Sequence, residues 1–336
     1  MEPRHSQSDF GNAESEYQAA TESAAIFDVS ERTQLQMSGA DRHSFFHGFC
    51  TNDIKGLNPG TGCEAFLCNV KGRILGHVFV FADDESLMIE SVPGQGEALT
   101  LHLNKYCLVE DVQLVDRTET LTEFLVSGPR AAQLLTDAGL DITELESWQH
   151  LKLTAQVGGA DSELHIKRVD IFGVSAFLIT GKTAQADALW DRLTNAGITP
   201  AGTSVFESLR IEAAFPVYGI DLSDENLAQE AARTDHAISF QKGCYLGQEP
   251  IARLNAMGHV NKALASFEIE AAETPPVGTV LLNPKNQDKE AGRATSVAWS
   301  WSAGKPIGLG MVRSLFLESG TELPFVTEPR TTATIR

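Results

Sequence analysis

The stretch 238–249 concentrates the side chains that could do chemistry in this chain. It carries the thiol of Cys244, the amine of Lys242, the amide of Gln248 and the carboxylate of Glu249. A neighbouring lysine favours the thiolate, which is the reactive and metal-binding form of cysteine. The residue types therefore predict a nucleophile, a redox thiol or a transient iron ligand at Cys244. The alternative from residue types alone is a loop that holds a buried, inert cysteine.

Two glycines, Gly243 and Gly247, flank the segment that contains Cys244 and Tyr245. Glycine adopts backbone angles that other residues avoid and allows a close approach to the main chain. One cysteine cannot hold an iron–sulfur cluster, which takes four protein ligands, so we expect no stable metal site here. Gln248 and Glu249 either orient the thiol or fix the loop by hydrogen bonds.

The composition limits the class of protein. The chain has 336 residues, enough for two or three domains with a substantial core. The formal net charge of -19 argues against direct binding to a nucleic-acid backbone over a broad surface. No apolar run approaches the length of about 20 residues that crosses a bilayer, so we expect no membrane association.

Five cysteines without a signal peptide predict reduced thiols and a cytoplasmic location. The four outside the loop are expected to be structural, because buried free cysteine is common; they are Cys50, Cys63, Cys68 and Cys107. Residues 1–23 are polar and acidic, unlike a secretory or mitochondrial leader, and we expect them to form a disordered N-terminus.

Two segments of the sequence after residue 23 show the same pattern, an expected strand followed by a Ser-Gly turn and an expected helix. Alternation over 35–37 precedes a helical run around 45–49, and the apolar segment 124–126 precedes another over 131–135. Between them, Lys71-Gly72 predicts a hairpin turn. Further strands are expected at 74–81 and 86–90, and further helices at 99–108, 186–193 and 203–211.

The pattern of expected elements changes after residues 274–278, from strands and helices to short strands alone. Short strands are expected at 279–282, 292–297 and 307–312, separated by turn residues, which is typical of a small β-barrel. We therefore expect two α+β halves over 24–270, dividing near residue 120, and a C-terminal barrel with a tail over 271–336.

The run from Lys242 to Glu249, continued by 251–253, 257–258 and 262–264, resembles the signature of the YgfZ family. These folate-binding proteins are related to the glycine-cleavage T-protein, and the resemblance covers roughly residues 24–315. It implies an α+β, T-protein-like fold that ends in a small β-barrel. Ala228 departs from the family pattern, which usually has proline before glutamine.

The resemblance also implies a site for tetrahydrofolate or a derivative. In the T-protein a glutamate at the position of Glu212 recognises the pterin ring, and a carboxylate can accept two hydrogen bonds from its amino-pyrimidine edge. Tyr218, Arg233 and Arg253 are further predicted contacts, the arginines for the glutamate tail. The alternative for Glu212 is a helix-surface carboxylate paired with Arg210 or another base.

One feature of the T-protein is missing. Gly76 and His77 stand where its aspartate pair, one of them catalytic, would be expected. His77 could replace that carboxylate as a general base, because histidine titrates near neutrality. The alternative is a histidine that is packed or hydrogen-bonded within a strand.

The resemblance implies that the chain is a folate-binding protein that assists assembly or repair of iron–sulfur clusters. Through this role it would support iron–sulfur enzymes, including some that modify tRNA. Its expected partners are folate and either iron–sulfur client enzymes or cluster carriers. The alternative is a folate-dependent aminomethyltransferase of the glycine-cleavage type. The missing aspartates and the presence of Cys244 argue against this alternative.

Overall fold

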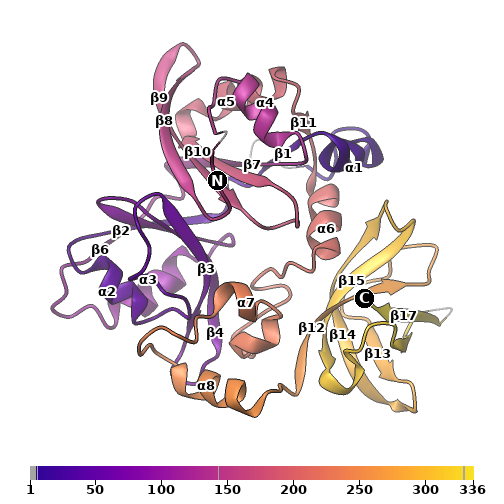
Figure 1. Ribbon diagram of the computed structural model, residues 1–336. Coiled ribbons are helices and arrows are strands. Elements are labelled where there is room, and N and C mark those ends of the chain that lie inside the picture. The colour runs from indigo at the N-terminus through magenta and orange to yellow at the C-terminus, as the bar shows by residue number, and fades with distance from the viewer. Residues whose placement is uncertain (1–4, 6, 143, 328–329) are drawn as a thin grey trace. The chain divides into compact units, whose positions relative to one another are not determined.

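The computed structural model describes residues 5, 7–142, 144–327 and 330–336. The chain divides into two compact units, Met1–Leu67 with Gly76–Phe206, and Cys68–Leu75 with Glu207–Arg336 (Figure 1). Each unit is described below by itself. Among the described residues, no helix combines the length and apolar character needed to cross a membrane.

The first unit contains a six-stranded sheet in the order β11-β1-β7-β10-β9-β8. Its neighbouring strands pair antiparallel except β1 and β11, which are parallel. The strands are β1 (Ala25–Asp28), β7 (Leu121–Ser127), β8 (His150–Val157), β9 (Ala160–Val169), β10 (Ala176–Lys182) and β11 (Thr199–Pro200).

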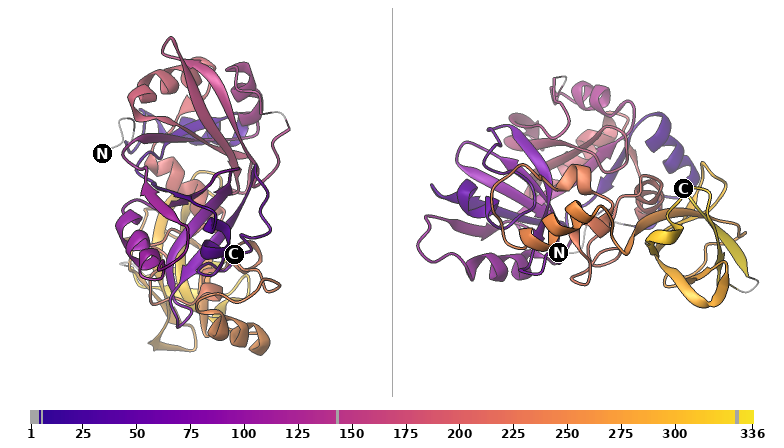
Figure 2. Two further views of the ribbon diagram at one scale, coloured as in Figure 1. Left: turned by 90° about the vertical axis from the view of Figure 1, so that its left-hand side faces the viewer. Right: turned by 60° about the horizontal axis from the view of Figure 1, so that its bottom comes forward.

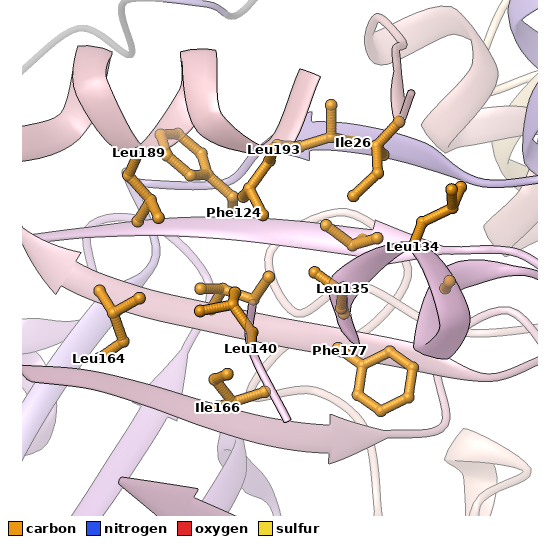
Figure 3. Close-up of a cluster of buried hydrophobic side chains, with 14 of the residues drawn as sticks. Ile26, Phe124, Leu134, Leu135, Leu140, Leu164, Ile166, Phe177, Leu189 and Leu193 are labelled. Carbon is orange, nitrogen blue, oxygen red and sulfur yellow. The ribbon is translucent and has the colours of Figure 1, made fainter. Parts of the chain in front are cut away.

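Helices supply the apolar cover of this sheet. They are α4 (Ala131–Asp137) and α5 (Ala186–Asn195), and the unit also contains α1 (Ala13–Glu22) and the short η1 (Thr183–Gln185), which buries no residue. Figure 3 shows Leu134 and Leu135 of α4, and Leu189 and Leu193 of α5, in the same cluster of buried side chains as Phe124 of β7. The residues i and i+4 of a helix lie on one face, so each helix buries its apolar side against the sheet.

A five-stranded sheet, in the order β3-β4-β5-β2-β6, completes the first unit. It has its own core with Leu35, Met37, Phe46, Val78 and Ile89 at 0–1% exposure. Its elements are β2 (Thr33–Ser38), α2 (Arg42–His47), β3 (Thr61–Cys68), β4 (Ile74–Ala82), β5 (Ser86–Ser91), α3 (Gly96–Asn104) and β6 (Gln113–Asp116).

The second unit combines short helices with a closed barrel in the order β12-β15-β14-β13-β16-β17, drawn in orange to yellow in Figure 2. Its helices are α6 (Thr203–Glu212) from Glu207 onward, η2 (Ala228–Ala231), α7 (Thr234–Ala237), α8 (Gln248–Met257) and η3 (Ser314–Phe316). The barrel strands are β12 (Lys262–Ile269), β13 (Val280–Asn283), β14 (Asn286–Ser300), β15 (Lys305–Arg313), β16 (Glu322–Phe325) and β17 (Thr331–Ile335).

The predicted fold class is confirmed. Both strand–turn–helix units are present, as β2 with α2 and β7 with α4, and the C-terminal barrel closes. The barrel starts with β12 at Lys262, before the expected boundary at 271, because β12 pairs with both β15 and β17. The helix expected at 99–108 lies at Gly96–Asn104.

The expectation of a disordered N-terminus is wrong for residues 13–22, which form α1. The side chain of Asn12 accepts a hydrogen bond from the backbone amide of Ser15 at 3.0 Å and caps this helix. Tyr17 and Ala20 are buried at 6% and 2% exposure. Glu16 is buried as well, and its carboxylate accepts a hydrogen bond from the amide of Gly202 at 3.0 Å.

Candidate functional site

The predicted thiol lies on a loop of the second unit that joins α7 to α8. Cys244 is exposed, whereas Lys242 and Tyr245 on either side are buried, at 8% and 9% exposure. The ammonium of Lys242 lies 4.7 Å from the centroid of the Tyr245 ring, within the range of a cation–π contact. The two buried side chains thus hold the segment while Cys244 faces solvent. That Lys242 favours the thiolate stays a prediction.

The C-terminal end of this loop is fixed by a close backbone approach. Gly247 has a φ of +81°, and a Cβ added there would lie 2.3 Å from the carbonyl oxygen of Asn69. Only glycine fits such a contact in this left-handed conformation. Gly247 is also the residue that precedes the first turn of α8, in which Ile251 is fully buried. The loop that carries the thiol is therefore held at its C-terminal end by the contact between Gly247 and Asn69.

The other predicted loop residues are placed less tightly. Gly243 is exposed, Gln248 is half-buried and Glu249 is exposed in the first turn of α8. Within the described part of the chain, the side chains of Gln248 and Glu249 make no hydrogen bond, so the expectation that they fix the loop in this way is wrong. A carboxylate in the first turn does favour the helix through the helix dipole.

The predicted folate contact Glu212 is the last residue of α6. Its Oε1 accepts hydrogen bonds from Ser300 at 2.6 Å, from Ser302 at 3.1 Å and from Ser208 at 3.5 Å. Ser300 ends β14 and is 1% exposed, and its hydroxyl also accepts a bond from the amide of Ala303 at 3.0 Å. These hydroxyls hold the half-buried carboxylate in one orientation.

Arg210 does not pair with Glu212, so only the first partner named in the alternative, and not pairing with another base, is excluded. Its fully buried guanidinium bonds to Asp221 at 3.0 Å, to Ser296 at 2.7 Å and to Glu207 at 2.7 Å. Burial opposes the charge of Arg210, but the bonds to Glu207 and the charge of Asp221 outweigh it and raise the Arg210 pKa. Arg210 joins α6 to β14 and is a structural anchor.

The remaining predicted contacts lie in the second unit. Arg233 is 9% exposed, and its guanidinium carbon lies 5.0 Å from the centroid of the Phe215 ring. Tyr218 is half-buried, and burial together with the charge of Asp224 raises the pKa of Tyr218 above its ordinary value. Arg253 is exposed on α8.

The first unit holds the residues at the positions of the T-protein aspartates. His77 is 5% exposed in β4, and its Nε2 lies 2.8 Å from Oε1 of the buried Glu64. Its ring packs against Phe66 at 4.9 Å between centroids. A Cβ at Gly76 would lie 2.9 Å from the Cδ2 methyl carbon of Leu99, so a side chain at that position would require the Leu99 side chain to shift. His77 is packed and hydrogen-bonded, as its structural alternative expected.

The roles of Ser300, Ser302 and Arg210 were not predicted from the sequence. The Ser-Trp-Ser turn after β14 carries hydroxyls that can serve a carboxylate, but their partner lies 88 residues away along the chain. An arginine between the apolar residues Leu209 and Ile211 was the only local sign of a buried ion pair. Among the described residues, no group of three His, Cys, Asp or Glu side chains is placed to hold a metal ion.

Comparisons with known proteins place the chain in a family. Residues 3–242 match the family model for the GCVT N-terminal domain, and residues 262–335 match that for the glycine cleavage T-protein C-terminal barrel domain. An aminomethyltransferase of Desulforamulus reducens is 26% identical over 314 residues, 92% of this chain and 84% of that protein. One of Rubrobacter xylanophilus is 27% identical over 305 residues, 90% of this chain and 80% of that protein.

Among solved structures, glycine cleavage system aminomethyltransferase T from Bartonella henselae aligns with a TM-score of 0.87 and 21% identity. The alignment covers 97% of this chain and 88% of that one, and shows the shared fold. The narrower resemblance to YgfZ proteins stays a prediction. Since the first family model alone matches more than half of its residues, the chain belongs to the GCVT family of the glycine cleavage T-protein.

Proposed function

We propose that this protein binds a reduced folate and acts through the thiol of Cys244 in the assembly or repair of iron–sulfur clusters, in the cytoplasm. The observation that carries the proposal is the exposure of Cys244. The chain has five cysteines, all within the described residues, and Cys244 alone is exposed. Its loop is anchored by the close approach of Gly247 to Asn69. Such a thiol is accessible to a cluster, a cluster carrier or a client enzyme, including enzymes that modify tRNA.

The second unit offers a carboxylate that suits a folate. Glu212 is half-buried and held by Ser300 and Ser302, which leaves it positioned to accept hydrogen bonds from the amino-pyrimidine edge of a pterin. Tyr218, Arg233 and Arg253 belong to the same unit, and we assign the two arginines to the glutamate tail. When bound, tetrahydrofolate or a derivative would supply one-carbon chemistry or only stabilise the fold.

Folate binding is tested with purified protein and 5-formyltetrahydrofolate as the probe. A ligand that binds only the folded state raises thermal stability with concentration. Glu212→Gln keeps the size of the side chain and removes the charge, and we expect it to raise Kd at least about tenfold, as lost charge-assisted bonds do. The control is Glu318→Gln, which makes the same change at an exposed residue of the same unit. This variant should bind 5-formyltetrahydrofolate as the wild type does. Equal binding by Glu212→Gln would refute the assignment of Glu212.

A second candidate is a folate-dependent aminomethyltransferase of the glycine-cleavage type. The names of the curated relatives favour it more than they favour the first candidate, and the chain spans 84% of the D. reducens protein. The residues in β4 disfavour it, because His77 is engaged by Glu64 and position 76 is a glycine, which carries no carboxylate.

The two candidates differ in a catalytic assay. An aminomethyl-lipoyl donor and tetrahydrofolate are incubated with the pure protein, and released ammonia and methylenetetrahydrofolate are measured. We expect no release above the uncatalysed rate. Enzymatic release that depends on protein concentration would replace the first candidate by the second.

A further inference from the structure

A cavity of about 190 Å³ opens in the first unit between its two sheets. Gln36 and Met88 line it from the five-stranded sheet, and His165 and Thr180 line it from the six-stranded sheet. The residues of the proposed folate and thiol sites belong to the second unit, so this cavity takes no part in the function proposed above.

The rim of the cavity is rich in cations. Arg117, Lys152 and Lys182 line it together with a single carboxylate, Glu163. Lys152 forms an ion pair with Asp83. Neither Arg117 nor Lys182 has a carboxylate partner within the part of the chain that the structure describes. The whole chain is acidic, with 45 acidic and 26 basic residues, whereas the rim of this cavity carries a net positive charge. A positive rim favours the binding of an anionic ligand.

Gln36 orients one of these cations. The Nε of Arg117 donates a hydrogen bond of 2.9 Å to Oε1 of Gln36, which itself lines the cavity. This bond holds the guanidinium beside the opening and leaves its terminal amino groups for a ligand. A guanidinium so placed can bind a carboxylate with two parallel bonds.

The wall of the cavity presents a hydrogen-bond acceptor. His150 Nε2 lies 2.8 Å from the carbonyl oxygen of Ala82, and His165 Nε2 lies 2.7 Å from His150 Nδ1. A carbonyl only accepts, so His150 carries its proton on Nε2 and accepts at Nδ1. His165 must then donate from Nε2, which leaves its Nδ1 as an acceptor. Burial keeps both rings neutral by lowering the pKa of each.

A buried cluster of charged side chains is hydrogen-bonded to Thr180, which lines the cavity. The ammonium of Lys167 donates to the Thr180 hydroxyl at 2.6 Å and to Glu123 at 3.0 Å, and also to Glu90. Arg32 adds a second cation at 3.2 Å from Glu123. Burial and the charge of Glu123 raise the pKa of Glu90 to about 7. The cluster is therefore neutral or positive near neutral pH and does not repel an anion.

We propose that this cavity binds a small dicarboxylate that carries a hydroxyl group. Arg117 and Lys182 bind the carboxylates, and the hydroxyl donates to Nδ1 of His165. The volume of 190 Å³ equals the share of about six water molecules at ~30 Å³ each, which suits a four-carbon acid and excludes a nucleotide. The three cations at the rim exclude an ammonium group in place of the hydroxyl.

The test is isothermal titration of the full chain with L-malate, against succinate, which lacks the hydroxyl, and against phosphate and chloride at equal ionic strength. We expect one malate per chain and a Kd for succinate at least about threefold higher, as for a lost neutral hydrogen bond. Phosphate that binds more tightly than malate would mean an inorganic-anion site and would overturn the proposal. Heat from malate no greater than that from chloride would also overturn it.

Charge reversal locates the site. Lys182→Glu and Arg117→Glu change exposed residues and should raise the malate Kd at least about tenfold each. Lys55→Glu makes the same charge change at an exposed position of this unit that does not line the cavity, and it should bind malate as the wild type does. If all three variants lose binding equally, the effect is one of net charge and the proposal fails.

Discussion

The hydroxyl of Ser300 donates a hydrogen bond of 2.6 Å to the carboxylate of Glu212 and thereby ties the end of α6 to barrel strand β14. A negative charge at the C-terminal end of a helix is disfavoured by the helix dipole. The hydroxyl donors Ser300, at the end of β14, and Ser302, in the β14–β15 connection, offset that cost and fix the direction of the carboxylate. The barrel therefore takes part in the proposed recognition of folate.

Ser300→Ala should weaken folate binding without unfolding the protein. It removes the hydrogen bond of 2.6 Å from the end of β14 to Glu212, and we expect Kd for 5-formyltetrahydrofolate to rise about three- to tenfold, as for the loss of one typical hydrogen bond. Ser302→Ala removes a longer bond of 3.1 Å from an exposed hydroxyl and should have a smaller effect. Titration calorimetry measures both. Unchanged binding in Ser300→Ala would show that Glu212 needs no support from the barrel.

Two glycines at the ends of α8 make a matched pair. Both are left-handed, with φ of +81° at Gly247 and +74° at Gly258, but a Cβ at Gly258 would meet nothing within 4 Å. Gly258→Ala should cost about 1–2 kcal/mol of unfolding free energy, the penalty of the left-handed conformation alone. Gly247→Ala should cost clearly more, because its Cβ would meet the carbonyl of Asn69 at 2.3 Å. Chemical denaturation that gives equal losses would exclude the close approach.

Stability should depend on pH through Glu90. Burial and Glu123 raise its pKa from 4.5 to about 7, so between these pH values the folded protein holds a proton that the unfolded chain has released. The contribution of Glu90 to the free energy of unfolding is complete below the unfolded pKa and falls as pH rises through the folded pKa, by up to about 1.4 kcal/mol per pH unit.

The comparison with Glu90→Gln isolates this effect. His150 and His165 have lowered pKa values and act with the opposite sign over part of the same range, but they are present in both proteins. From about pH 5 to pH 8 the wild type should lose roughly 1–3 kcal/mol relative to the variant. Parallel stability curves from urea denaturation would contradict the raised pKa.

The local elements could be predicted from the sequence because their signals are local. The alternation over 35–37 and the Ser-Gly turn before α4 each located an element within a few residues, and the pattern after 278 indicated three barrel strands but neither the full length of β14 nor the strands β16 and β17. The helix α1 was missed because its composition is polar and acidic. Its stability depends on long-range contacts, such as the bond from the amide of Gly202 to the buried carboxylate of Glu16.

The candidate site was predictable only in part, because some of its contacts join residues that are distant in the sequence. The roles proposed for Cys244 and Glu212 were inferred from motif residues that lie close together in sequence. The partners of these motifs do not, since Ser300 meets Glu212 from a distant strand. The cluster of Lys167, Glu90 and Glu123 joins three strands, and no sequence pattern indicated it. Buried ion pairs are specified by tertiary packing, and each partner alone resembles a surface charge.

The most direct test of the proposed function is rescue of cells that lack their own family member, read out as the activity of a [4Fe–4S] enzyme. The wild type, Cys244→Ser and the half-buried control Cys107→Ser are expressed at equal levels. We predict that the wild type and Cys107→Ser restore the activity and that Cys244→Ser leaves it at the level of the empty cells. Equal rescue by Cys244→Ser would contradict a functional thiol and with it the proposed role in cluster maintenance.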